Sequence, residues 1–210
     1  MSAVTFDDQF VKDAAALGVS CELQTLSKLS HYIEELLKWN RHFNLLGMNE
    51  VDGIKSKHIL DCLAVSPFLS GQTILDVGTG AGLPGIPLAI VNPDKHFVLL
   101  DSNGKKTRFL FQVKVALGLS NVTVENCRIE NYQSTQQIDI VMSRAFASLR
   151  DMVDLSQHLL GDKGQWVAMK GRYPEQEIAE LPSSAQVIGT EKLSIPGEEG
   201  ERHLIRLQRI

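Results

Sequence analysis

The segment from Ile74 to Gly85 limits the possible folds more strongly than any other part of this sequence. It reads Ile-Leu-Asp-Val-Gly-Thr-Gly-Ala-Gly-Leu-Pro-Gly, so an apolar run that contains an acid is followed by three alternating glycines and a proline. Glycine has no Cβ and reaches positive φ freely, which lets a backbone turn sharply and approach a ligand closely. The pattern predicts a buried strand, a cofactor-binding loop and the start of a helix.

Two classes of cofactor bind to loops of this kind. The dinucleotide spacing G-x-G-x-x-G, with an acid about 20 residues later, is matched by Gly80, Gly82, Gly85 and Asp101. Asp76 would repel a pyrophosphate, and Pro84 has no N–H with which a helix start could bind one. A carboxylate would instead attract the sulfonium and ammonium charges of S-adenosylmethionine. We therefore expect Asp76 and the glycines to bind this methyl donor rather than a nicotinamide dinucleotide.

The composition is that of one folded unit in the cytoplasm. The chain has 210 residues, of which 43% are hydrophobic and 22% are charged, and this is enough for a single core. No apolar run reaches the roughly 18 residues of a membrane helix, and the segment Met1 to Asp8 lacks the basic start of a signal peptide. Cys21, Cys62 and Cys127 are widely spaced, which predicts neither a disulfide framework nor a metal site.

Charge is unevenly distributed along the chain. The net charge of −4 argues against a general nucleic-acid binder, which would carry a basic excess. Basic side chains gather in the N-terminal third, at Lys38, Arg41, His42, Lys55, Lys57 and His58, whereas Glu198, Glu199 and Glu201 lie near the other end. From composition alone, two ordinary solvated faces are the preferred interpretation.

The spacing of apolar residues divides the chain into two parts. Residues 1–70 show helical periodicity, which predicts a helical extension with a first helix that ends at Gly18 and a later helix from Ile54 to Phe68. Residues 71–210 alternate short apolar runs with helical segments, which predicts an α/β unit with a mostly parallel sheet and helices on both faces. The two parts are expected to pack as one compact unit.

Seven strands are predicted in the second part, at Thr73–Val77, His96–Leu100, Val122–Glu125, Ile138–Met142, Gln165–Met169, Gln186–Leu193 and His203–Arg209. The helices between them are expected at Pro84–Val91, Lys105–Leu117, Leu149–Leu160 and Glu175–Ala179. The last two strands leave no room for a helix between them. They should therefore form a hairpin in which one strand runs antiparallel to the rest of the sheet.

Ligands of open parallel sheets bind at the carboxyl ends of the strands. The segments selected by this rule are Asp76 to Leu83, Asp101 and Ser102, Asn126 to Asn131, Ser143 to Phe146, and Lys170 to Arg172. Asp101 is well placed to accept hydrogen bonds from both ribose hydroxyls, and its alternative role is to cap the helix that follows. Lys170 and Arg172 are expected to hold phosphates of a nucleic acid, although an ordinary solvated loop explains them nearly as well.

Several segments resemble one known family over nearly the whole chain. They are Lys38-Trp39-Asn40-Arg41-His42-Phe43-Asn44-Leu45, Lys57-His58-Ile59-Leu60-Asp61, the glycine loop from Asp76 to Pro87, Leu100-Asp101-Ser102, and Ser143-Arg144-Ala145-Phe146-Ala147. Together they look like ribosomal small-subunit methyltransferase G, also called glucose-inhibited division protein B. The resemblance implies a class I methyltransferase with a Rossmann-like, seven-stranded sheet. It also implies transfer of a methyl group from S-adenosylmethionine to N7 of one guanine in bacterial 16S rRNA.

Carried over residue by residue, the resemblance implies cofactor contacts at Gly78, Leu83, Ile129, Glu130 and Arg144. Ser102 adjoins the second-strand acid and is expected to take part in cofactor binding. Arg144 is further expected to be catalytic, because its donors could grip a phosphate or O6 of guanine. A surface salt bridge is its alternative explanation. The 16S rRNA or the small ribosomal subunit is the expected partner, and the protein is expected to be a monomer.

Other residues of the matching segments have simpler explanations. Trp39, Phe43 and Leu45 are expected to form an apolar helix face that packs on the sheet, with base stacking on Trp39 as the alternative. His58 and Asp61 lie one helical turn apart and could form a hydrogen bond, but their spacing predicts no zinc site.

Rival functions are kept beside the rRNA methyltransferase. A class I methyltransferase that acts on a small molecule or a protein would suit the acidic composition. A non-catalytic rRNA-binding assembly factor and a nicotinamide enzyme are the others.

Overall fold

The predicted alternation of strands and helices is present in the computed structural model, which describes residues 4–46, 51–144, 146 and 148–210. The strands are β1 (Thr73–Val77), β2 (His96–Leu100), β3 (Val122–Glu125), β4 (Ile138–Ser143), β5 (Leu160–Lys170), β6 (Ala185–Lys192) and β7 (His203–Arg209). The helices of the first part are α1 (Asp8–Ala16), α2 (Leu23–Phe43), α3 (Val51–Ile54), the π-helix η1 (Lys55–Leu60), α4 (Asp61–Leu63) and the 3₁₀-helix η2 (Ser66–Phe68). Those of the second part are α5 (Gly85–Val91), α6 (Gly104–Leu117), the 3₁₀-helix η3 (Ile129–Asn131), α7 (Leu149–Ser156) and α8 (Glu175–Ala179).

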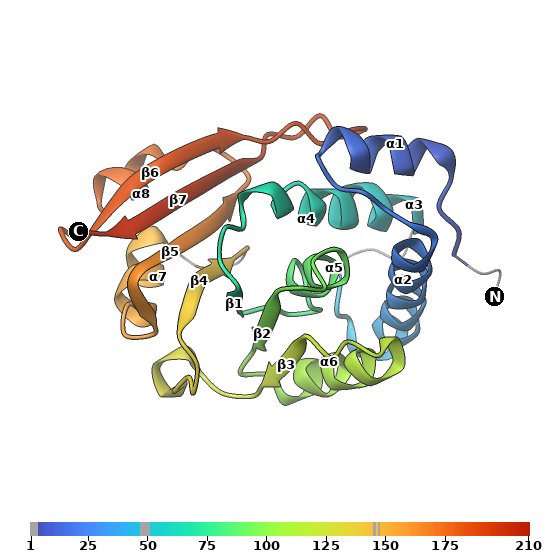
Figure 1. Cartoon of the computed structure of the whole chain (residues 1–210), viewed down its shortest axis with the longest axis horizontal. Coiled ribbons are helices and arrows are strands. Elements are labelled where there is room, and N and C mark those ends of the chain that lie inside the picture. The colour runs from blue at the N-terminus through green and yellow to red at the C-terminus, as the bar shows by residue number, and fades with distance from the viewer. Residues whose placement is uncertain (1–3, 47–50, 145, 147) are drawn as a thin grey trace.

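The strands of the described residues form one seven-stranded sheet in the order β3-β2-β1-β4-β5-β7-β6 (Figure 1). The pairs from β3 to β5 are parallel, and β7 runs antiparallel to both of its neighbours. The predicted hairpin is therefore confirmed. Because the chain moves outward from β1 to β3 and then returns to β4 on the other side of β1, the carboxyl ends of β1 and β4 border the crevice in which sheets of this type bind ligands.

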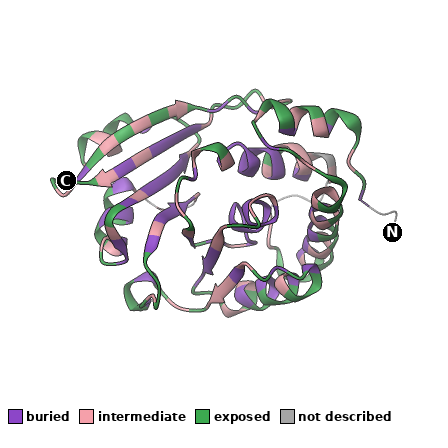
Figure 2. Cartoon of the chain, viewed as in Figure 1, coloured by how far each residue is buried: buried purple, intermediate pink, exposed green. Residues whose placement is uncertain are grey.

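The two faces of the sheet carry alternating side chains, as a buried parallel strand requires. Ile74, Phe97 and Leu99 point to one face and join the core beneath α1, α2, α4, α5 and α6. Leu75 and Val98 point to the opposite face and join the core beneath η3 and α7. Helices thus cover both faces, and the buried residues of Figure 2 follow the strands and the inner sides of the helices.

Helix α2 joins the N-terminal part to the sheet. It places Tyr32, Ile33 and Leu36 in the core without exposed surface, and it lies beside α6 in Figure 1. The Tyr32 hydroxyl donates a hydrogen bond of 2.8 Å to the carbonyl of Ala81, in the glycine loop. The N-terminal part therefore helps to hold the cofactor loop that the later sequence encodes.

Removal of this hydroxyl should destabilise the protein. We expect Tyr32→Phe to lower the free energy of unfolding by about 1–3 kcal/mol, because the buried carbonyl of Ala81 loses its partner. Urea denaturation measures the difference. Tyr173→Phe is the control, because Tyr173 is 49% exposed and should change stability by less than about 0.5 kcal/mol. Equal stabilities of Tyr32→Phe and the wild type would contradict the proposed support of the loop.

Two helix predictions need correction. The predicted helix Leu149–Leu160 ends at Ser156, because Leu160 pairs with Ile138 and begins β5 five residues before the predicted strand. The apolar spacing is shared by both structures, and strand pairing decides the outcome. The Ser156 hydroxyl also accepts a hydrogen bond of 2.8 Å from the indole of Trp166 in β5, which fixes the end of the helix against the strand. The predicted helix Ile54–Phe68 is present but contains the π-helix η1 and ends in the 3₁₀-helix η2.

Candidate active site

The glycine loop after β1 has the backbone that its sequence predicts. Gly78, Gly80 and Gly82 all have positive φ, at 66°, 62° and 88°. The loop is also tied to β2, because the N–H groups of Gly78 and Thr79 both donate to the carbonyl of Leu100, at 2.8 and 3.2 Å. The loop therefore stands at the carboxyl ends of β1 and β2 in one defined conformation.

The glycines of the loop differ in what surrounds them. A Cβ atom at Gly78 would meet nothing within 4 Å, so the backbone there borders open space. At Gly82 a Cβ would lie 2.5 Å from Ile86 Cγ1 and 2.8 Å from Leu110 Cδ2. Gly78 thus leaves room for a ligand, whereas Gly82 lets the loop pack against α5 and α6. Leu83, only 3% exposed, belongs to the packed side.

Asp76 is fully buried beneath the loop. Its Oδ2 accepts hydrogen bonds from the Thr79 hydroxyl, at 2.7 Å, and from the N–H of Gly85, at 2.9 Å. Its Oδ1 has no hydrogen-bond partner among the described residues. Burial raises the pKa of this carboxyl to about 7, and the two hydrogen bonds oppose that rise. Asp76 therefore braces the loop with one oxygen and keeps the other available to a cationic group.

Asp101 lies at the end of β2 and faces the loop. Its Oδ2 accepts a hydrogen bond of 3.0 Å from the N–H of Gly80 and lies 3.6 Å from Lys106 Nζ. The helix that follows is capped by Asn103, which accepts from the N–H of Lys105, so the capping alternative for Asp101 is wrong. Ser102 is exposed beside it. Asp101 is thus positioned where a ribose could be bound.

The segment after β3 supplies the third predicted contact. Ile129 is 6% exposed and begins η3. Glu130 is exposed at the next position. An apolar wall beside a polar side chain suits an adenine ring.

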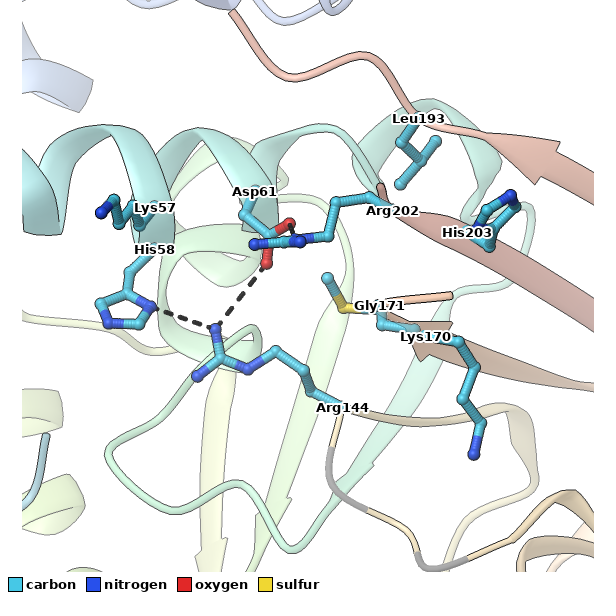
Figure 3. Close-up of a pocket in the computed structure, with 10 residues that line it drawn as sticks. Lys57, His58, Asp61, Arg144, Lys170, Gly171, Leu193, Arg202 and His203 are labelled. Carbon is cyan, nitrogen blue, oxygen red and sulfur yellow. Dashed lines mark hydrogen bonds and ion pairs between the residues drawn. The ribbon is translucent and has the colours of Figure 1, made fainter. Parts of the chain in front are cut away.

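A cavity of about 330 Å³ opens at the carboxyl ends of β4, β5 and the start of β7 (Figure 3). It is lined by Lys57, His58, Asp61, Arg144, Met169, Lys170, Gly171, Leu193, Arg202 and His203. These residues come from η1, α4 and the C-terminal hairpin as well as from the central strands. Three parts of the chain that are distant in sequence therefore build one cationic cavity.

Arg144 is the side chain that joins this cavity to β4. Its Nη1 lies 3.4 Å from His58 Nδ1 and 3.8 Å from Asp61 Oδ2, and these contacts are visible in Figure 3. Burial, and then the charge of Arg144, lower the pKa of His58 to about 4. His58 is therefore neutral near pH 7, and its Nδ1 can accept a hydrogen bond from the guanidinium. Arg144 forms more than the surface salt bridge that was its alternative explanation.

Asp61 holds the cations of the cavity in place. It is 4% exposed, and its Oδ1 accepts a hydrogen bond of 3.0 Å from Arg202 Nε. Burial raises the pKa of this carboxyl, while Arg202 and Arg144 oppose the rise. The predicted hydrogen bond between His58 and Asp61 is replaced by their shared contact with Arg144.

The remaining predicted substrate residues have different environments. Lys170 lines the cavity, but its Nζ is paired with Glu177 Oε2 at 2.8 Å. Arg172 is exposed and does not line the cavity. Ala145 and Ala147 of the Ser143–Ala147 segment, like Met1, Ser2 and Ala3 of the N-terminal segment, lie outside the described residues.

Sequence reasoning missed Arg202 and His203, which follow the acidic run near the C-terminus. His203 Nδ1 is buried and has no hydrogen-bond partner in the described part of the chain. The one available signal was the position of these residues at the start of the strand that pairs with β5. That signal becomes informative only when the strand order is known.

The sheet order, the reversed β7 and the glycine loop after β1 define a class I methyltransferase. Solved structures share this fold at low sequence identity. The glycopeptide N-methyltransferase MtfA complexed with S-adenosyl-L-methionine has a TM-score of 0.62, with 10% identity over 73% of this chain and 87% of that chain. TrmN from Thermus thermophilus has a TM-score of 0.57, with 15% identity over 74% of this chain and 53% of that chain.

The GidB family model, described as rRNA small subunit methyltransferase G, matches residues 25–205. The chain belongs to this family. Relatives named ribosomal RNA small subunit methyltransferase G include one from Aeromonas salmonicida, 50% identical over 88% of both chains. A relative of the same name from Marinomonas sp. is 45% identical over 98% of this chain and 99% of its own.

Among the described residues no helix is both long enough and apolar enough to span a membrane. Nor do their His, Cys, Asp and Glu side chains form a group of three or more that could hold a metal ion.

Proposed function

We propose that this protein transfers the methyl group of S-adenosylmethionine to N7 of a guanine in the 16S rRNA of the small ribosomal subunit. The observation that carries the proposal is Arg144, which stands between the glycine loop side of β4 and the cationic cavity. Family membership and the names of the relatives supply the class of substrate.

The loop residues fit the proposed cofactor. Gly78 leaves open space, and Asp76 Oδ1 is a buried acceptor that lacks a partner, as a site for a cationic ligand requires. We propose that Asp76, Gly78, Gly80, Gly82 and Leu83 form the cofactor loop, together with Asp101, Ser102, Ile129, Glu130 and Arg144. When bound, S-adenosylmethionine supplies an electrophilic methyl group.

The cavity fits the proposed substrate. The edge of guanine that carries N7 also carries O6, and both are acceptors. Arg144 and Arg202 offer guanidinium donors, and the neutral ring of His58 can donate through its second nitrogen. Lys57, Lys170 and Arg172 are proposed to hold neighbouring phosphates, with Lys170 partly neutralised by Glu177.

The reaction makes few chemical demands on these side chains. N7 of guanine has a lone pair and no proton, so attack on a methyl group needs no general base. Alignment of the reacting atoms and exclusion of water can then supply much of the rate enhancement, up to roughly 7–11 kcal/mol. Asp61 serves this alignment because it fixes Arg202 and Arg144 around the cavity. The neutral state of His58 is compatible with a reaction that abstracts no proton.

Cofactor affinity should depend on pH through Asp76. The pKa of this carboxyl is about 7, so it is protonated at pH 6 and ionised at pH 8, and a cationic ligand favours the ionised form. We expect the affinity for S-adenosylmethionine to rise about tenfold from pH 6 to pH 8, with release of a proton on binding. Calorimetry in buffers of different ionisation enthalpy measures both quantities.

Asp76→Asn is the control for this prediction. The amide oxygen can still accept from Thr79 and Gly85, but the side chain no longer titrates. We expect a flat pH profile in this variant, and a profile that stays as steep as the wild type would assign the dependence to another group.

Methyl transfer tests the proposed function directly. Tritiated S-adenosylmethionine is incubated with 30S particles, naked 16S rRNA and small-molecule acceptors, and N7-methylguanine is mapped in the labelled RNA. Label at one guanine in rRNA or particles is the expected result. Label only in a small acceptor would contradict the rRNA assignment, and stabilisation by NAD but not by S-adenosylmethionine would contradict the cofactor.

The remaining expectations belong with this proposal. An enzyme that acts on ribosomal RNA should be found in the cytoplasm, and we propose a monomer that consists of a helical extension, 1–70, and a methyltransferase unit, 71–210. Sedimentation of the purified protein tests the oligomeric state.

A further inference from the structure

A second cavity, of about 270 Å³, lies between the last turns of α2 and the first turns of α6. It is lined by Trp39, Phe43, Lys105 and Arg108, and we refer to these four residues as the aromatic pocket. The Trp39 ring lies 5.0 Å from the ring of Phe43 and 5.5 Å from that of Phe109, between ring centroids. Trp39 thus packs on the core, as expected from the sequence, whereas Phe43 remains 45% exposed.

The surroundings of the aromatic pocket are cationic. Lys105 and Arg108 are both exposed, and Arg108 Nε donates a hydrogen bond of 3.1 Å to the carbonyl of Gly104, which keeps its stem along α6. The nearest printed acid on α2 is Glu35, which is engaged by Lys38 at 3.3 Å and by Gln112 at 3.0 Å. Aromatic rings bordered by cations bind single-stranded nucleic acid, because bases stack on the rings and phosphates pair with the cations.

The aromatic pocket is close to the proposed cofactor site. Lys105 directly precedes Lys106, whose Nζ lies 3.6 Å from Asp101 Oδ2 beside the glycine loop. Both sites therefore lie at the carboxyl edge of the sheet, one on each side of the loop from the cationic cavity's point of view across β1.

We propose that the aromatic pocket binds one unpaired nucleotide of the rRNA strand that carries the target guanine. Its base stacks on Phe43 and Trp39, and its phosphate is held by Lys105 and Arg108. The inference rests on the proposed function, which supplies RNA as the partner, and the charge of the rim favours RNA over a protein or a second copy of the chain.

Tryptophan fluorescence tests the pocket without any methyl transfer. The chain has two tryptophans, and Trp166 is 1% exposed, so quenching by an added oligonucleotide reports on Trp39. The probe is a single-stranded oligoadenylate, which contains no guanine and cannot be methylated at the proposed target. We expect it to quench the emission of the wild type and leave that of Trp39→Phe unchanged.

Matched variants locate the base and the phosphate. We expect Phe43→Ala to weaken oligoadenylate binding at least fivefold, which is the lower end of the range for loss of one stacked base. Phe111→Ala is the control, because Phe111 is 60% exposed on α6 but does not line the pocket. Lys105→Ala should weaken binding and reduce the salt dependence by about one counterion.

Kinetics on rRNA separate this inference from the proposed function. We expect Phe43→Ala to raise KM for the RNA substrate at least fivefold, with a smaller change in kcat. Quenching and a loss of binding in Phe43→Ala would support the pocket even if the wild type failed to methylate rRNA. Absence of quenching, or equal binding by Phe43→Ala and Phe111→Ala, would overturn it. So would a defect of Phe43→Ala on 30S particles but not on naked rRNA, because a ribosomal protein would then be the occupant.

Discussion

Replacement of Arg144 by alanine is expected to lower the rate of methyl transfer to rRNA by about 10²–10³-fold, a loss typical of removing one preorganised electrostatic donor from an active site. The guanidinium contacts His58 and Asp61 at the wall of the cationic cavity, and it is 29% exposed. It can therefore reach a bound guanine while its position is fixed by neighbours. Without it, the cavity keeps its shape but loses the donor nearest to β4.

The fold should survive this substitution. Asp61 is buried, but it keeps its hydrogen bond of 3.0 Å to Arg202, so the change leaves no buried carboxylate without a partner. Thermal denaturation and circular dichroism check the fold, and single-turnover transfer of labelled methyl groups measures the rate. Arg144→Lys should restore part of the activity, because lysine keeps the charge but not the planar fork of donors.

Arg150→Ala is the matched control, because Arg150 is exposed on α7. It should transfer methyl groups at the wild-type rate. Wild-type turnover in Arg144→Ala would refute the assigned role, and global unfolding of the variant would show that Arg144 is structural instead.

The second large effect is expected from two alanine substitutions in the glycine loop, which should fail in different ways. Gly82→Ala should destabilise the protein by about 3 kcal/mol or more, because its φ is 88° and the new Cβ would lie 2.5 Å from Ile86 Cγ1. Gly78→Ala should cost only about 1–2 kcal/mol, since the new methyl group enters open space and only the left-handed backbone is strained. The same methyl group would occupy the space that we assign to the cofactor.

Urea denaturation and cofactor titration separate the two effects. Gly82→Ala should unfold at a lower urea concentration, whereas Gly78→Ala should keep most of its stability and lose most of its affinity for S-adenosylmethionine. Equal losses of stability in both variants would contradict the distinction between a packing glycine and a ligand-facing glycine. Unchanged cofactor affinity in Gly78→Ala would remove that residue from the proposed site.

Most of the sheet could be predicted from local sequence. β1, β2, β3 and β7 have the bounds that their apolar runs predict, because a strand buried on both faces needs a continuous apolar run bounded by polar or turn residues. The beginning of β5 could not be predicted in this way. Leu159 and Leu160 extend the apolar spacing of α7, and only the pairing of Leu160 with Ile138 makes Leu160 part of a strand.

The candidate site divides in the same manner. Asp76, the glycines and Asp101 could be identified from the sequence because they lie within 26 residues of one another on consecutive elements. The cationic cavity could not, because Asp61 and Arg202 are 141 residues apart and meet only across the finished sheet. The same holds for Tyr32, whose hydroxyl reaches the carbonyl of Ala81 from a helix 49 residues away.

The order of the residues by itself determined the strands, the conformation of the glycine loop and the family to which the chain belongs, since each of these depends on short-range spacing or on the identity of neighbouring residues. The tertiary structure alone decided the state of the titratable groups. Burial raises the pKa of Asp76 and lowers that of His58, and burial exists only after distant segments have packed and excluded water. The same packing brings Arg144 to Asp61, and this contact, which no local pattern encodes, places the cations where a nucleic acid could be bound.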